Sequence, residues 1–192
     1  MVTYGSTADF VRLEHMIYQP SKIPGAWIID IEPIEDSRGF FAMTWLPDEL
    51  RERGMNTSLA QCNLAFNSKK GTLRGMHFQK RPHGQAKMIR TTRGALLDVI
   101  IDLREESPTY RQWDAVELSA DNHRMLYMPE GIAHGYITLL DDTEAYYNVS
   151  GPWVPEAESG VRWDDPVFAV EWPFPPAVIS DRDQRWALTP QP

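Results

Sequence analysis

Residues 71–103 have the sequence GTLRGMHFQKRPHGQAKMIRTTRGALLDVIIDL, and this stretch decides the fold class. Its three β-prone segments, 71–79, 86–92 and 95–103, are separated by glycine, proline and basic residues. Short apolar runs broken by turn residues at this spacing are typical of antiparallel strands. The stretch therefore predicts the middle of a β-sandwich or barrel.

The same pattern extends outward in both directions. Further strands are expected at Trp27–Ile31, Phe40–Trp45, Ser58–Phe66, Arg111–Leu118, Arg124–Met128, Ala133–Leu140 and Glu144–Val149. One short helix is predicted over 47–53, with a proline and two acids in its first turn and Gly54 as its stop. There is no βαβ alternation and no glycine-rich phosphate loop. We therefore predict an all-β fold with antiparallel strands and short peripheral helices.

The length of 192 residues suits one domain. Residues 1–26 show no sustained hydrophobic period and are expected to form an N-terminal extension. Residues 27–192 are expected to form a single domain, with the tail from Pro152 wrapping around the barrel.

Composition limits the classes of partner. With 19 basic and 27 acidic residues the formal charge is −8, so the chain as a whole has no electrostatic footprint for nucleic acid. A local basic pocket for a small anion remains compatible with this charge. No apolar run of about 18 residues and no signal-peptide pattern occurs, so no membrane partner is expected. The single cysteine, Cys62, excludes an internal disulfide and favours a reducing cytoplasm.

Polar residues gather on the predicted middle strands. Arg74, His77 and Gln79 lie on one strand, and His77 and Gln79 share a face because they are two residues apart. Lys87 begins the next strand, and His134 follows a tight turn. Each histidine alone is compatible with a hydrogen-bonded barrel residue. Together these residues favour a polar site inside a barrel large enough for a small ligand.

A metal site is the first alternative. His77, His83 and His134 with a carboxylate would suit a first-row metal. However, no two of these histidines stand at the close spacings that favour chelation, and Arg74 and Lys87 would repel a cation. No metal is therefore expected.

Other polar residues remain ambiguous from the pattern alone. Strand alternation turns one of Tyr146 and Tyr147 inward, either as a core aromatic or as a proton donor. Asp98 and Asp102 are as compatible with solvated or turn-capping roles as with function. Cys62 has no obvious base neighbour and is expected to be structural.

Short motifs occur in a fixed order along the chain. They are DSRGFF (36–41), QCN (61–63), LRGMHFQ (73–79), QAK (85–87), DVIIDLR (98–104), SPT (107–109), PEGIAHG (129–135), WDDP (163–166), WP (172–173) and SDRD (180–183). This ordered set resembles the dTDP-4-dehydrorhamnose 3,5-epimerase family, from about residue 27 to residue 186. The resemblance implies a cupin-fold jelly-roll barrel.

The resemblance also implies roles for individual residues. His77 matches the catalytic base, Asp183 the acid paired with it and Tyr147 the general acid, while Lys87 matches a lysine near the sugar carbonyl. Residues implied to contact the substrate are Arg38, Gln61, Asn63, Arg74, His134, Trp153, Glu158 and Arg182.

The implied activity is epimerisation of a nucleotide-linked 4-keto-6-deoxyhexose. A proton on C3 or C5 is removed and returned, because both carbons adjoin the C4 ketone. This chemistry requires no metal or redox cofactor. The family resemblance further implies a homodimer with Arg38 near a shared site.

The chain departs from the family pattern at the nucleotide end. Met43 stands where a glutamate is usual, and Trp153 replaces a tyrosine. The nucleotide and the choice between 3- and 3,5-epimerisation therefore stay open. Two further enzymes are compatible with the residues, namely a 3-epimerase or ketoisomerase on another nucleotide sugar and a metal-dependent cupin. A catalytically inactive sugar-binding module is the other alternative, although an intact base–acid set argues against it.

Overall fold

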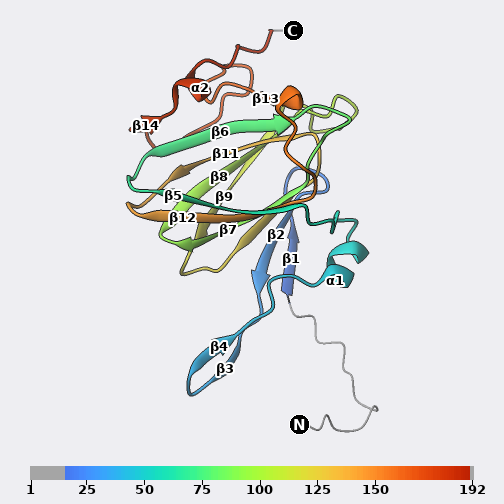
Figure 1. Cartoon of the computed structure of the whole chain (residues 1–192), viewed down its shortest axis with the longest axis vertical. Helices are drawn as coiled ribbons and strands as arrows, with labels where there is room; N and C mark the ends of the chain where they lie inside the picture. Colours follow the sequence, from blue (N-terminus) through green and yellow to red (C-terminus); the bar gives the residue numbers. More distant parts are fainter. Residues whose placement is uncertain (1–15, 191–192) are drawn as a thin grey trace.

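Two antiparallel β-sheets lie face to face in the computed structural model, which describes residues 16–190 (Figure 1). The first sheet has the order β1 (Met16–Pro20), β2 (Trp27–Ile31), β10 (Met125–Met128), β7 (Lys87–Arg93), β12 (Thr143–Val149) and β5 (Gln61–Asn67). The second has the order β13 (Glu158–Gly160), β6 (Thr72–Gln79), β11 (Ile132–Thr138), β8 (Ala95–Asp102) and β9 (Trp113–Ser119). The predicted all-β antiparallel architecture is confirmed.

Three short helices and two small strand elements complete the described chain. They are the hairpin β3 (Ile34–Asp36) and β4 (Gly39–Phe41), helix α1 (Pro47–Glu52), the 3₁₀ turn η1 (Pro155–Ala157), strand β14 (Val178–Ile179) and helix α2 (Asp181–Gln184). Helix α1 confirms the predicted helix, with proline first and acids in its first turn. No helix among residues 16–190 is long and apolar enough to cross a membrane.

The space between the sheets is filled by alternate residues of the strands. Leu96 and Ile100 of β8, Leu126 of β10 and Ala145 of β12 belong to this core and are almost fully buried. Because successive side chains of a strand point to opposite faces, polar residues between these positions either face outward or line an internal site.

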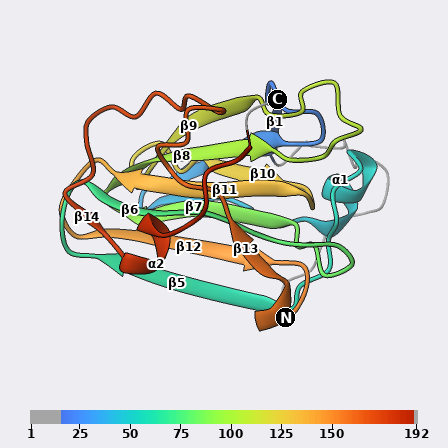
Figure 2. The same ribbon diagram turned by 90° about the horizontal axis from the view of Figure 1, so that it is seen from above.

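The outer face of each sheet is covered differently. Helix α1, Trp45 and Met55 pack with the β1–β2–β10 end of the first sheet. Val161, Phe168 and Trp172 of the C-terminal segment cover the outer face of the second sheet. Figure 2 shows this segment crossing the layered sheets, and β14 pairs in parallel with β6. The C-terminal segment is thereby fixed along the strand that carries His77.

Residues 16–26 are built into the sandwich. β1 pairs along its length with β2, and Ile23 and Ala26 lie in the core between the sheets. The apolar residues before Trp27 are scattered among glycine, serine and proline, so the sequence predicted only an extension here, whereas β1 is a strand. That prediction for residues 1–15 lies outside the described residues.

The expected strand Phe40–Trp45 ends early. β4 ends at Phe41 because its only partner is the three-residue β3, and the hairpin projects away from both sheets (Figure 1). Residues 42–46 then lead into α1 without a pairing strand. The hairpin leaves Phe40 and Phe41 exposed.

Candidate active site

A cleft opens between the inner faces of the two sheets. Its deeper part has a volume of about 510 Å³, and an adjoining part has about 360 Å³. His77, Lys87, Tyr147 and Arg182 line both parts, so the two parts share one wall. This size suits a ligand with two connected moieties.

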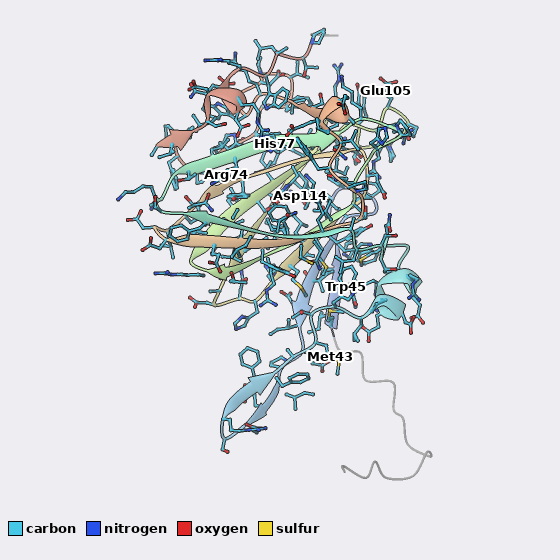
Figure 3. All side chains as sticks on the ribbon, in the orientation of Figure 1. Met43, Trp45, Arg74, His77, Glu105 and Asp114 are labelled. Atoms are coloured by element: carbon cyan, nitrogen blue, oxygen red, sulfur yellow. The ribbon has the colours of Figure 1, made fainter. Side chains whose placement is uncertain are left out.

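Eleven of the twelve predicted site residues line this cleft. The deeper part contains Arg74, His77, Lys87, His134, Tyr147, Arg182 and Asp183, and the adjoining part also contains Gln61, Asn63, Trp153 and Glu158. Figure 3 shows Arg74 and His77 on the same strand, with Met43 far away beside the hairpin. Within one chain the structure does not bring Arg38 to the cleft. Its side chain is exposed on the hairpin and pairs with Asp36.

His77 of β6 is held by an acid from the C-terminal segment. Its Nε2 lies 2.6 Å from Oδ1 of Asp183, which is only 3% exposed. The other carboxylate oxygen accepts a hydrogen bond of 3.3 Å from the Gly75 amide. Burial would raise the pKa of Asp183, but its interactions with His77 and Gly75 outweigh burial and lower that pKa. The aspartate is therefore a stable anion that orients the imidazole ring.

Helix α2 presents this aspartate. The Asp183 amide donates to Oγ of Ser180, the N-cap residue, at 3.1 Å. On the same turn, Arg182 donates to Oε1 of Glu158 at 2.8 Å and approaches Nε2 of His77 to 3.4 Å. One short turn thus places an anion and a cation beside the same imidazole.

Lys87 is buried and feels the charge of a buried carboxylate, Asp98. Burial lowers the pKa of Lys87 to about 8, against the opposing charges of Asp98 and Glu158. Asp98 is fully buried, and its Oδ2 lies 2.9 Å from Nε2 of His134. Among the described residues its Oδ1 has no hydrogen-bond partner. Burial raises the pKa of Asp98, while His134 and Lys87 oppose this shift.

Sequence reasoning left the role of Asp98 open. A signal for its position was present, since Leu96 and Ile100, two residues away on either side, are both core residues. Asp102 has a different role. It accepts hydrogen bonds from Arg104, Ser107 and Thr109 in the turn after β8.

Tyr147 enters the cleft from the sheet opposite His77. It lies on the inner face of β12, and burial raises its pKa, with Arg74 opposing the shift. Tyr146 faces the other side of the sheet with exposed Cys62 and lines a separate hollow. The alternation therefore resolves which of the two tyrosines can meet a ligand in the cleft.

Two further residues were not predicted, namely Tyr136, which lines the deeper part of the cleft, and Asn67, which contacts it. Asn67 donates to the Tyr136 hydroxyl at 3.3 Å and accepts from Nε of Arg74 at 2.8 Å. Burial raises the pKa of Tyr136 to about 12. This chain of contacts fixes the Arg74 guanidinium at the cleft, where its planar fork suits an anionic oxygen.

The part of the chain that the structure describes contains no cluster of side chains suited to bind a metal ion. No three His, Cys, Asp or Glu side chains there lie in an arrangement that could hold an ion. His83 is exposed and does not line the cleft with His77 and His134. His77 and His134 instead each pair with an aspartate, His77 with Asp183 and His134 with Asp98.

Comparison with known proteins agrees with the resemblance. A family model described as dTDP-4-dehydrorhamnose 3,5-epimerase matches residues 20–190. A Sinorhizobium fredii protein named dTDP-4-dehydrorhamnose 3,5-epimerase is 38% identical over 173 residues, which cover 90% of this chain and 89% of the relative. A Streptomyces niveus protein named dTDP-4-dehydrorhamnose 3-epimerase is 40% identical over 170 residues, covering 88% and 82%.

A solved structure shares the fold. The Bacillus anthracis enzyme named dTDP-4-dehydrorhamnose 3,5-epimerase, with TDP and pyrophosphate bound, superposes with a TM-score of 0.87 at 38% identity. The match covers 91% of this chain and 99% of that one. The cupin fold implied by the motifs is therefore confirmed.

We predict that Lys87 titrates near pH 8, unlike an exposed lysine. Below that pH the ammonium persists, and above it the neutral amine predominates, because burial disfavours the charged form. NMR of ¹³C-dimethylated protein should show one lysine resonance titrating in this range, which Lys87→Met removes and exposed Lys80→Met keeps. Asp98→Asn should move this titration to still lower pH, since it removes an opposing charge. A Lys87 resonance that titrates above pH 10 would contradict this placement.

Proposed function

Because the chain belongs to the dTDP-4-dehydrorhamnose 3,5-epimerase family, we propose that its cleft binds a nucleotide-linked 4-keto-6-deoxyhexose and that His77 and Tyr147 exchange protons with the sugar. The protein is a sugar-nucleotide epimerase, an isomerase. The observation that carries the assignment of residues is the His77–Asp183 pair, which faces the same cavity as Tyr147 from the opposite sheet.

His77 acts as the base. The C4 ketone acidifies the protons on C3 and C5, since the electron pair left by either proton delocalises onto O4. A neutral imidazole accepts that proton near neutral pH. The ionised Asp183 then stabilises the imidazolium and holds the ring in one orientation.

Tyr147 acts as the acid. Its raised pKa keeps the phenol protonated at neutral pH, so it donates rather than accepts. Donation from the sheet opposite His77 delivers the proton to the other face of the ring carbon and inverts the centre. Solvent then returns a proton to the phenolate and removes one from the imidazolium.

Lys87 and His134 stabilise the intermediate. The enolate carries its charge on O4, and a preorganised cation or donor at that oxygen is usually the largest electrostatic contribution. The Lys87 ammonium is suited to this role below its pKa of about 8. The charge of the buried Asp98 carboxylate supports the ammonium form of Lys87, and the same carboxylate orients His134.

The adjoining part of the cleft receives the nucleotide. Gln61 and Asn63 offer amide groups, and the Trp153 side chain is 56% exposed with an indole face available for stacking on a base. Arg74 and Arg182 supply guanidinium groups for the diphosphate. The TDP and pyrophosphate bound by the B. anthracis relative support a nucleotide ligand.

A homodimer completes the site. Arg38 is exposed on a hairpin that also exposes Phe40 and Phe41, and this arm projects from its own sandwich (Figure 1). In a twofold dimer the arm of each subunit reaches the partner's cleft, which gives Arg38 a ligand to bind. The nucleotide-sugar substrate and the free thiol of Cys62 both fit a cytoplasmic location.

Epimerisation at C3 alone is the second candidate function. The S. niveus relative is named a 3-epimerase, while the S. fredii relative is named a 3,5-epimerase, and identity to the two is nearly equal. Incubation with dTDP- and CDP-linked 4-keto-6-deoxyglucose in deuterium oxide distinguishes these outcomes by mass. One incorporated deuteron indicates one centre, two indicate both, and none indicates a binding module.

The first test of the chemistry is His77→Ala. We expect turnover to fall by roughly 10²–10⁴-fold, the usual contribution of a positioned base. Deuterium uptake at C3 and C5 should stop, while the melting temperature stays close to that of the wild type because the side chain is 25% exposed and lines the cleft rather than the core. The control is His83→Ala, which lies outside the cleft. Uptake near the wild-type rate in His77→Ala would refute the assignment of the base.

Tyr147→Phe tests the acid separately. Proton abstraction by His77 remains possible, so we expect exchange with solvent to persist while net inversion is lost. Tyr146→Phe, on the outer face of the same strand, is the matched control and should invert normally. Normal inversion by Tyr147→Phe would remove the tyrosine from the mechanism.

Subunit complementation tests the shared site. Arg38→Glu and His77→Ala chains are co-expressed with different tags, and the heterodimer is isolated. If Arg38 serves the partner's cleft, the heterodimer contains one intact site and regains activity at low substrate, whereas each mutant homodimer stays impaired. A heterodimer no more active than the homodimers, or a wild-type protein that is monomeric by light scattering, contradicts the proposal.

A further inference from the structure

The segment that carries Asp183 and Arg182 is attached to the barrel on both sides. Upstream, the Ala177 amide donates to Gly71 at 2.8 Å and β14 pairs with β6. Downstream, the indole of Trp186 lies on Gly160 of β13. The turn between these attachments is the four-residue helix α2, and so short a helix depends on its flanking contacts for its position.

The Trp186 ring packs unusually closely against the backbone of Gly160. A Cβ added to Gly160 would lie 2.3 Å from Cε2 and 2.6 Å from Nε1 of Trp186. Only glycine leaves room for the ring to rest directly on the backbone of β13. Gly160 is also the residue that pairs with His77 in the β13–β6 register.

The same indole reaches the base. The ring centroids of Trp186 and His77 are 6.3 Å apart with an interplanar angle of 67°, an edge-to-face arrangement. The indole N–H is buried and has no hydrogen-bond partner among the described residues. Burial of an unpaired N–H is unfavourable, so packing rather than hydrogen bonding holds the ring in this place.

We propose that Trp186 is a positioning residue that, seated on Gly160, clamps the Asp183–Arg182 turn against His77 and fixes the orientation of the base. The inference rests on the proposed function and adds a residue outside the proton-transfer set. Beyond Trp186 the next hydrogen bond anchoring the chain is from the Thr189 amide to Asp165, at 2.6 Å. Without the indole, the downstream side of the turn loses its nearest attachment.

The test compares steady-state kinetics and deuterium uptake for Trp186→Ala, Trp186→Phe and Gly160→Ala. A small displacement of a catalytic group costs up to about 10²-fold in rate, so we expect Trp186→Ala to lower kcat by about 10-fold or more while KM changes little. Trp186→Phe, which keeps an aromatic ring on the glycine, should recover most of the loss. Gly160→Ala should reproduce it with the tryptophan intact. Leu188→Ala, exposed in the same segment, is the control and should match the wild type.

A double-mutant cycle separates positioning from general stability. If Trp186 acts through the His77–Asp183 pair, Trp186→Ala should have little further effect on kcat in an Asp183→Asn background. Additive effects would overturn the proposal, as would wild-type kcat in Gly160→Ala or a loss that merely follows the fraction of unfolded protein. Should Trp186→Ala melt below the assay temperature, the cycle with Gly160→Ala decides. Failure of the proposed function is distinguishable, because the wild type would then take up no deuterium.

Discussion

The hydrogen bond between His77 and Asp183 joins residues 106 positions apart and is the contact on which the site depends. It requires β6 to be central enough to face the cleft and the C-terminal segment to return along it through β14. The buried anion gives the imidazole a fixed orientation and stabilises its charged form. The path of the C-terminal segment therefore determines how the base is oriented.

A two-sheet sandwich suits a reaction that needs a base and an acid on opposite sides of one ring. The second sheet supplies His77 and the first supplies Tyr147, while core side chains deeper in the sandwich keep the sheets apart. Lys87 from the first sheet lines the same cleft, and the charge of buried Asp98 on the second sheet favours its ammonium form. The local charge of the cleft is therefore independent of the net charge of −8, because basic side chains from separate strands converge there.

Several features of the structure depend on tertiary contacts that local sequence patterns do not predict. β1 is recognisable as a strand only through its pairing with β2, and the predicted strand Phe40–Trp45 ends at Phe41 because β3 offers no longer partner. Asp98 lies between two core positions on β8, yet its role emerges only from its contact with His134 and its charge interaction with Lys87. Arg38 carries a family motif and still lies away from the cleft of its own chain.

The sequence by itself determined the all-β class, most strands, helix α1 and eleven of the residues that line the cleft, because strand alternation and turn chemistry act over a few residues and because the motifs carry family information. Only the tertiary structure decided that Asp98 meets His134, that Arg38 lies away from the cleft of its own chain, and that Trp186 rests on Gly160. Those outcomes depend on sheet register and on packing between segments far apart in the chain. Such contacts cannot be predicted from any one stretch of sequence, because their stability depends on both partners.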